Sequence, residues 1–343
     1  MLFDLKPKEN VKDFFNYVEE LRAFVGYLTN SSTRMIVVRG LRRTGKSSLL
    51  RVGLKKAGKP FILIDTRELR SISRKSFESK VLEELKSIKG IPESLMEKIE
   101  GLEAGIRISF RKDENLWKLL KKLNPIIAVD EVQMLNGTGV ESFFAAAYDN
   151  TTCKIVLTGS EIGVLDAFLG KDDTKAPLFG RVYEEIKMHT LTPEKTSEFL
   201  DMGFKEAKKD IPKEIIGRAL EELDGIVGWT AMFGNLALSL DPNTALKRAV
   251  TTGTKLAYSE FETFLATRGT AKNRYLALIR IIASKAIGWS DLKRSLEIEL
   301  KESISDPQFT NYIHSLMDYG FVLHADNLYS IPDPLLRMAL ASQ

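Results

Sequence analysis

Hydrophobic and polar positions follow two different patterns along the chain. Up to about residue 190, short runs of apolar and β-branched residues alternate with segments whose apolar residues recur every three or four positions. The short runs predict buried strands, and the longer segments predict helices. The predicted strands are 34–39, 60–65, 126–130, 154–159 and 182–187. Strands that alternate with helices form a parallel sheet with helices on both faces, so we expect an α/β domain over residues 1–190.

The interval from Ile88 to Arg111 interrupts this pattern. It contains three glycines and one proline, whereas the neighbouring segments 76–87 and 115–123 keep helical spacing. Glycine and proline are unfavourable inside helices. We therefore predict an irregular insertion between the second and third strands.

After residue 190 the alternation stops and the pattern becomes helical. Thr192 followed by Pro193 is typical of a helix start, with a capping side chain and proline at the first helical position. Paired glycines at positions 225 and 228 predict a break between two helices. Residues 191–270 are thus predicted to form a helical lid domain.

The last seventy residues change once more. Helical spacing near 274–285, 290–296 and 306–318 is followed by two short strand-like runs after Gly320. This order is typical of a winged helix–turn–helix, which we expect over residues 271–343.

Composition narrows the class of protein. The chain has 343 residues, of which 44% are hydrophobic and 28% charged, and this excludes a disordered or collagen-like protein. The single cysteine, Cys153, excludes a disulfide framework and a cysteine-based zinc cluster. No run approaches the roughly 18 apolar residues of a membrane span, and the first residues lack the apolar run of a signal peptide. We expect a soluble, cytoplasmic protein that does not associate with membranes.

The formal net charge of +4 conceals an uneven distribution. No acidic residue occurs between Glu20 and Asp65, and this stretch holds ten Lys or Arg. In contrast, no Lys or Arg occurs between Lys301 and Arg337. The excess of positive charge between Glu20 and Asp65 indicates either an anion site or a solvated basic face. The motif inside this stretch helps to decide between the two.

Within the basic stretch, an apolar run from Met35 leads into Gly40-x-x-x-x-Gly45-Lys46-Ser47, and helical spacing follows. A strand, a glycine-rich loop and a helix are the context of a phosphate-binding loop, or Walker A motif. Backbone N–H groups of such a loop close around a β-phosphate, its lysine reaches the γ-phosphate, and its hydroxyl joins a Mg²⁺ shell. The predicted nucleotide-binding residues are Gly40, Leu41, Arg42, Arg43, Thr44, Gly45, Lys46, Ser47 and Ser48.

A second motif, Pro125-Ile-Ile-Ala-Val-Asp130-Glu131, is an apolar strand with two acids at its carboxyl end. Ligands of open α/β sheets bind at those strand ends. We therefore predict that Asp130, with Ser47, holds Mg²⁺ and that Glu131 polarises the attacking water. The alternative is a plain helix cap after the strand.

Two further side chains are candidates for catalysis. Ser160 follows the fourth strand, where a hydroxyl could sense the γ-phosphate, although Thr158-Gly-Ser160 is also an ordinary turn. Arg181 precedes the fifth strand and could neutralise charge in the transition state, in its own subunit or a neighbour's. Its alternative is a salt bridge to Glu184 or Glu185.

Other residues are interpreted as structural. Asp65 ends the second strand and is expected to cap Arg67 rather than to lie near a metal. Cys153 and the three tryptophans at 117, 229 and 289 lie in apolar settings that favour packing.

The winged helix carries little of what DNA binding requires. Residues 273–343 hold seven bases and eight acids, and the segment 306–318 has no Lys or Arg. Phosphate neutralisation supplies much of the affinity for DNA. An interaction with an unknown protein partner is favoured, while DNA contact through another face stays open.

The motifs at 39–49 and 128–133 resemble those of the archaeal ATPase family, a branch of the P-loop NTPases related to AAA+ and STAND proteins. The likeness continues through 146–149, 157–161, 177–181 and 329–334. The resemblance implies a parallel sheet ordered 5-1-4-3-2, a helical lid and a C-terminal winged helix, with ATP and Mg²⁺ as ligands. Where family members often have Gly-x-Pro-Gly-Trp-Leu in the lid, this chain has Val227 in place of the proline.

These patterns together predict a Mg²⁺-dependent ATPase that binds ATP and ADP and whose nucleotide state repositions the lid and winged helix. Two alternatives stay open. One is an ATP-dependent DNA-binding initiator or mobile-element protein, and the other is a nucleotide-binding scaffold with negligible turnover.

Overall fold

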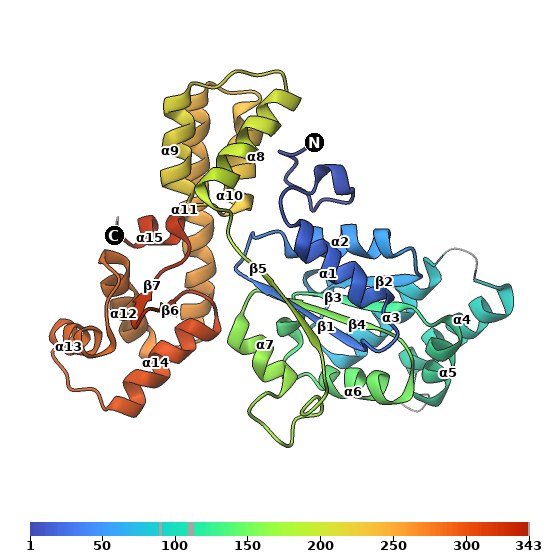
Figure 1. Ribbon diagram of the computed structural model, residues 1–343. Helices are drawn as coiled ribbons and strands as arrows, with labels where there is room; N and C mark the ends of the chain where they lie inside the picture. Colours follow the sequence, from blue (N-terminus) through green and yellow to red (C-terminus); the bar gives the residue numbers. More distant parts are fainter. Residues whose placement is uncertain (89–90, 109–112, 342–343) are drawn as a thin grey trace. The chain divides into compact units, whose positions relative to one another are not determined.

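The computed structural model describes residues 1–88, 91–108 and 113–341. Its contacts divide the chain into two compact units (Figure 1). The sheet unit consists of Pro7–Gly40 and Gly45–Met188. The C-terminal unit consists of Met1–Lys6, Leu41–Thr44 and His189–Gln343. The predicted division into three domains at 1–190, 191–270 and 271–343 stays a prediction.

The sheet unit is built on five parallel strands in the order β2-β3-β4-β1-β5, which confirms the predicted topology. The strands are β1 (Met35–Gly40), β2 (Phe61–Asp65), β3 (Ile126–Asp130), β4 (Ile155–Gly159) and β5 (Glu184–Met188). In the register, Val37 of β1 lies opposite Leu157 of β4 and Glu185 of β5. Every predicted strand is therefore present, with ends that differ by no more than two residues.

Helices cover both faces of this sheet, with α1 and α2 on one side and α6 and α7 on the other (Figure 1). The helices are α1 (Val18–Thr29), α2 (Lys46–Ala57), α3 (Arg74–Lys86), α4 (Glu93–Ile108), α5 (Asp113–Leu123), α6 (Val140–Asn150) and α7 (Ile162–Leu169). Short 3-10 turns are η1 (Val11–Asp13), η2 (Thr66–Glu68) and η3 (Val132–Leu135). Phe77, Phe143 and Phe144 are fully buried where α3 and α6 meet in the core.

Helix α4 corrects the prediction of an irregular insertion over 88–111. Leu95, Ile99 and Leu102 recur at helical spacing and are buried in the core. Burial of three large side chains outweighs the cost of about 1 kcal/mol for each glycine in a helix. Residues 89–90 and 109–111 of that interval lie outside the described residues.

The C-terminal unit begins with four helices, as predicted for the lid. They are α8 (Pro193–Glu206), α9 (Lys213–Leu223), α10 (Val227–Ala237) and α11 (Pro242–Ala266). The Thr192 side chain accepts a hydrogen bond from the Lys195 amide, which confirms the predicted helix cap. A winged helix–turn–helix follows, also as predicted. It contains η4 (Gly269–Ala271), α12 (Lys272–Ser284), α13 (Trp289–Leu300), α14 (Asp306–Asp318), β6 (Leu323–Ala325), β7 (Leu328–Ser330) and α15 (Pro334–Ala341).

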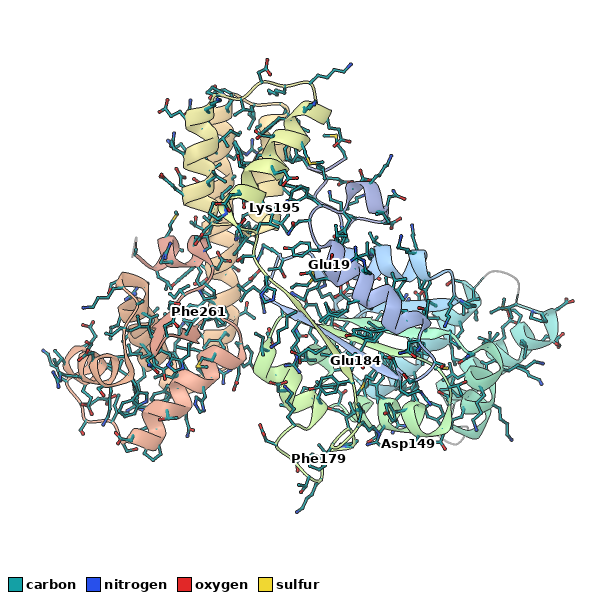
Figure 2. The ribbon with its side chains drawn as sticks, in the orientation of Figure 1. Glu19, Asp149, Phe179, Glu184, Lys195 and Phe261 are labelled. Carbon is teal, nitrogen blue, oxygen red and sulfur yellow. The ribbon has the colours of Figure 1, made fainter. Side chains whose placement is uncertain are left out.

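An aromatic cluster joins α11 to the winged helix. Phe261, which Figure 2 shows on α11, packs edge-on against Phe321 with ring centroids 5.2 Å apart. Phe264 packs in the same way against Tyr275 at 5.2 Å, and the Arg268 guanidinium covers the Phe264 ring at 4.1 Å. The lid and the winged helix therefore share one apolar core.

The first residues of the chain also belong to the lid core. Phe3 is fully buried, and its ring lies where any side chain on Gly203 or Gly234 would collide with it, at 2.2 and 2.3 Å. Its carbonyl accepts a hydrogen bond from Asn235. No helix of the described residues is long and apolar enough to cross a membrane.

Candidate active site

The predicted phosphate loop lies between β1 and α2, and its glycines determine its backbone conformation. Gly45 adopts a φ of 96°, a left-handed conformation that favours glycine, directly before α2. Gly45 is the N-cap of α2 and has no side chain to cap the first turn. The start of a helix is a place where anions bind. The Lys46 ammonium donates to the Gly40 carbonyl at 2.9 Å, so the lysine side chain folds back along the loop.

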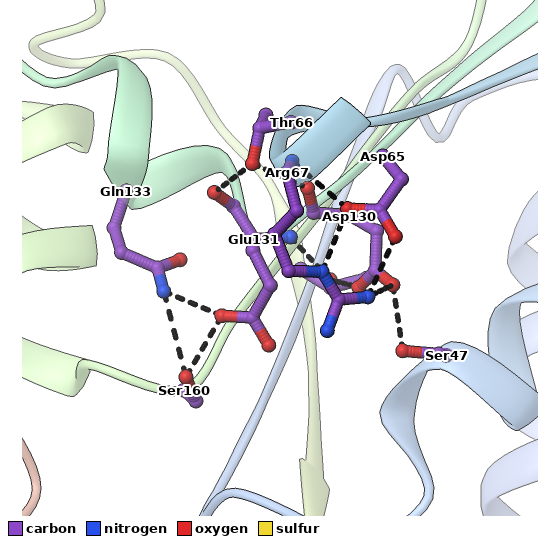
Figure 3. Close-up of polar contacts among 9 residues, drawn as sticks. Ser47, Asp65, Thr66, Arg67, Asp130, Glu131, Gln133 and Ser160 are labelled. Carbon is purple, nitrogen blue, oxygen red and sulfur yellow. Dashed lines mark hydrogen bonds and ion pairs between the residues drawn. The ribbon is translucent and has the colours of Figure 1, made fainter. Parts of the chain in front are cut away.

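Asp130 ends β3 and is buried, with 4% of its surface exposed. One carboxylate oxygen accepts a hydrogen bond from the Ser47 hydroxyl at 2.6 Å, and the other accepts from the Thr158 hydroxyl. Figure 3 shows the hydrogen bond between Ser47 and Asp130. Hydroxyl and carboxylate oxygens are the ligands that Mg²⁺ prefers, so Ser47 and Asp130 fit the predicted metal site.

Glu131 has a left-handed backbone, with φ 55° and ψ 46°. For a residue with a side chain this conformation costs about 1–2 kcal/mol. Two hydrogen bonds hold it: Thr66 Oγ1 donates to the Glu131 carbonyl at 2.8 Å, and the Glu131 amide donates to Thr158 Oγ1 at 3.2 Å. This turn directs the Glu131 carboxylate to the Ser160 hydroxyl, which donates to it at 2.8 Å (Figure 3). The structure therefore brings Glu131 and Ser160 together.

Arg67 is a site residue that the sequence prediction missed. Its guanidinium pairs with Asp65 at 2.6 Å and lies 3.5 Å from Asp130. Burial alone would raise the pKa of Asp65, but hydrogen bonds from Arg67 and its charge bring that pKa below its usual value. The Asp65 side chain also accepts from the Arg67 amide, which confirms the predicted cap. The sequence did contain one indication of Arg67. It lies two residues after Asp65, which is opposite Asp130 in the register of β2 and β3.

The middle of the phosphate loop, Leu41–Thr44, belongs to the C-terminal unit. Arg42 and Arg43 both form ion pairs with Glu260 of α11, at 3.1 and 2.6 Å. The Arg43 guanidinium also lies 4.0 Å from the centroid of the Trp229 ring. These two predicted binding residues therefore direct their side chains to the lid.

The remaining loop residues have local partners. The Thr44 hydroxyl donates to the Leu41 carbonyl at 2.8 Å and so closes the loop on itself. The Ser48 hydroxyl accepts from the Lys8 amide at 2.9 Å, within the sheet unit.

The lid contacts the loop without the proline that family members often carry. The Gly228 amide, next to Val227, donates to the Arg43 carbonyl at 3.0 Å. A side chain on Gly228 would come within 2.6 Å of Arg43 Cβ. The glycine is therefore what this close approach requires. Trp229, predicted to serve packing alone, has a second role because it stacks on Arg43.

Arg181 does not join this site in its own chain. It precedes β5, whose first residue pairs with Ile36 near the start of β1, whereas the phosphate loop follows the end of β1. Six strand residues span about 20 Å. Arg181 instead pairs at 2.5 Å with Asp149, which Figure 2 labels near the end of α6. The alternative of a salt bridge is therefore right in kind, but the predicted acids, Glu184 and Glu185, are wrong and the partner is Asp149.

Comparison with known proteins adds to this geometry. A family described as "ATPase domain predominantly from Archaea" matches residues 14–232. The family of the MCM protein C-terminal winged helix-turn-helix domain matches residues 269–331. No curated protein matches the chain.

Several solved structures are similar. The Walker-type ATPase PABY2304 of Pyrococcus abyssi is 32% identical, with a TM-score of 0.83 over 99% of both chains. AMPPCP-bound DnaA from Aquifex aeolicus is 18% identical over 91% of both chains, with a TM-score of 0.46. The RuvB Holliday junction branch migration motor of Thermotoga maritima is 11% identical over 96% of both chains, with a TM-score of 0.46.

The family match spans more than half of the chain, and the Pyrococcus abyssi structure extends the likeness over nearly all of it. The phosphate loop, Asp130 and Glu131 lie inside the matched region. The chain therefore belongs to the family of ATPase domains found predominantly in Archaea, and it is an ATP hydrolase.

Proposed function

We propose that this ATPase binds ATP together with Mg²⁺ and uses hydrolysis to switch the conformation of its lid and winged helix. Its role would be regulatory or remodelling rather than metabolic. The observation that carries the proposal is the contact of Arg43, inside the phosphate loop, with Trp229 and Glu260 of the lid.

The loop residues provide the binding of the triphosphate. The amides at the start of α2 and the Lys46 ammonium would bind the β- and γ-phosphates. Ser47 and Asp130 would hold Mg²⁺ with the oxygens that now share a hydrogen bond. When bound, the ion neutralises the charge that develops as the β–γ bond breaks.

The residues after β3 and β4 provide the chemistry. The Glu131 carboxylate accepts a proton from the water that attacks the γ-phosphorus, since it is the acid next to the metal-binding Asp130. The Ser160 hydroxyl, which donates to Glu131, would sense the γ-phosphate. Arg67 adds a positive charge beside Asp130.

The C-terminal unit supports the switch. Trp229 contacts Arg43 with the face of its ring and donates from Nε1 to both carboxylate oxygens of Asp333, at 3.2 Å each. Asp333 lies just before α15, whose first-turn amides at Leu335 and Leu336 also donate to it. A continuous series of contacts therefore leads from the phosphate loop through the lid to the last helix. A change of loop backbone on phosphate binding would act directly on this series.

The tryptophan itself provides the test. In a variant with Trp117→Phe and Trp289→Phe, Trp229 is the only tryptophan. We expect its emission to change when ATP binds and to return as the ATP is consumed. Adding Lys46→Ala should abolish both changes. An emission spectrum unaffected by ATP, in a protein that binds ATP by equilibrium dialysis, would contradict the proposed switch.

We further propose that the winged helix binds a protein and not duplex DNA. Gln308, one of the few side chains of α14 able to read a base edge, donates its amide to the Tyr312 hydroxyl at 2.9 Å. Helix α14 has no Lys or Arg to neutralise phosphates. A duplex affinity that weakens with salt and is lost on removal of residues 271–343 would support the DNA-binding alternative. Multiple-turnover release of phosphate would exclude the scaffold alternative.

A further inference from the structure

Gln133 is a buried polar residue that the assigned roles do not use. It lies in η3, two residues after Glu131, and only 5% of its surface is exposed. Its amide nitrogen donates to the Glu131 carboxylate and lies 3.4 Å from the Ser160 hydroxyl oxygen. Because Ser160 also donates to the same carboxylate oxygen, Gln133, Ser160 and Glu131 form a closed triangle of hydrogen bonds (Figure 3).

The orientation of the Gln133 amide is determined by its neighbours. The opposite orientation would place the amide oxygen against the Glu131 carboxylate, and two acceptors repel each other. In the observed orientation, the oxygen is buried and has no hydrogen-bond partner among the described residues. A buried acceptor without a partner is unfavourable. The contact with Glu131 is therefore strong enough to keep the amide in an orientation that is otherwise costly.

Gly159 makes room for this arrangement. A side chain on Gly159 would come within 2.8 Å of the Gln133 amide oxygen and 3.1 Å of Leu165. The glycine at the end of β4 thus admits the glutamine beside Glu131. The Gln133 amide is therefore surrounded by residues from separate parts of the chain: Glu131 before η3, Gly159 at the end of β4, and Ser160 directly after it.

We propose that Gln133 is a positioning residue for ATP hydrolysis, which holds the Glu131 carboxylate at a fixed place beside Ser160. The proposal rests on the assignment of Glu131 as the general base. Gln133 donates to the carboxylate oxygen that also accepts from Ser160, so it acts on the position of the group that accepts a proton from water.

Gln133 bonds to Glu131 and Ser160, which are assigned to hydrolysis and not to binding of the nucleotide. Binding of ATP depends on the loop and on Lys46, so the KM for ATP should change little.

The test uses Gln133→Met in the full chain, because methionine keeps the volume and removes the hydrogen bonds. We expect kcat to fall roughly ten- to a hundred-fold, as for other residues that orient a reacting group. The KM for ATP should stay within about two-fold of wild type, so the loss should lie in kcat alone. Met134→Ala is the matched control, since Met134 lies in the same turn and is exposed. It should leave both quantities unchanged.

A second variant, Gln133→Glu, keeps the size of the side chain, removes the donor and places a second carboxylate beside Glu131. Repulsion between the two carboxylates should displace Glu131, so kcat should fall at least as far as in Gln133→Met. An unchanged kcat in both variants would overturn the proposal. Absence of turnover in the wild type, or equal turnover in Glu131→Gln, would instead contradict the proposed function.

Discussion

The Arg43 guanidinium and the Trp229 indole form a stacked pair, with 4.0 Å between the charged carbon and the ring centroid. Arg43 has a left-handed backbone, with φ 64°. Glu260 also pairs with the guanidinium, at 2.6 Å. A residue of the phosphate loop is thereby held by side chains of the lid.

Trp229→Phe tests the link between the lid and the last helix. Phenylalanine keeps the aromatic face but cannot donate to Asp333. Burial raises the pKa of Asp333, against the hydrogen bonds from Leu335, Leu336 and Trp229, so loss of one donor leaves a buried carboxylate less well satisfied. We expect the free energy of unfolding, from urea titration at pH 7, to fall by about 1.5–3 kcal/mol. Trp289→Phe, at a partly exposed site, is the control and should change it by less.

Glu131→Gln should separate binding from hydrolysis. The amide keeps the shape of the side chain but cannot accept a proton from water, so turnover should fall by roughly 10²–10⁴-fold. Affinity for ATP should persist, whereas Lys46→Ala should lose it with the positive charge of the loop. Phosphate release and equilibrium dialysis measure the two effects. Turnover equal to that of wild type would remove Glu131 from its assigned role.

Arg181→Ala should behave as the loss of a structural ion pair. Its partner Asp149 is half-exposed, and the side chain of Arg181 also donates to the Pro177 carbonyl. We expect Arg181→Ala and Asp149→Ala each to lower the free energy of unfolding by about 1 kcal/mol or less, with turnover unchanged in dilute solution. A rate that falls in Arg181→Ala, and that an excess of Lys46→Ala chains restores, would show that Arg181 acts on a neighbour's nucleotide.

Because of Lys154, we expect part of the free energy of unfolding to increase at alkaline pH. Lys154 is buried just before β4, and its ammonium donates to the carbonyls of Asn30 and Thr33. Burial, with the charges of Lys59 and Arg34, lowers its pKa to about 8 from 10.5. Between pH 8 and 10.5 the unfolded chain therefore binds more protons at this residue, so its contribution to the free energy of unfolding rises with pH.

Comparison with Lys154→Met isolates this contribution. The slope against pH should be greater in wild type than in the variant by up to about 1.4 kcal/mol per pH unit in that interval. Lys187→Met is a suitable control, because Lys187 is exposed on β5. Parallel curves for wild type and Lys154→Met would show that Lys154 titrates normally.

The sequence predicts those parts of the fold and site that depend on local pattern. The five strands and the phosphate loop follow from runs of neighbouring residues, and the places of Asp130 and Ser160 follow from strand ends in a parallel sheet. Helix α4 was missed because three buried side chains, spaced at 95, 99 and 102, count for more than glycine content.

Contacts between distant residues account for the rest of what the sequence did not predict. Arg43 and Trp229 are separated by most of the sheet unit, and nothing near either residue indicates the other. Arg67 and Gln133 owe their places to the side chains they meet across strands, Asp130 and Ser160. Sequence spacing specifies which strand ends are adjacent, but not which polar atoms pair there.

The burial of Phe3 in the lid has a consequence for the order in which the parts of the chain fold. Its carbonyl bonds to Asn235, 232 positions away, and its ring completes the apolar interior around Gly203 and Gly234. During synthesis the first residues emerge long before those partners exist, while the sheet unit already has its whole sequence. Closing such a long loop is slow compared with local helix formation. We therefore expect the lid interior to form late in folding, after the sheet unit.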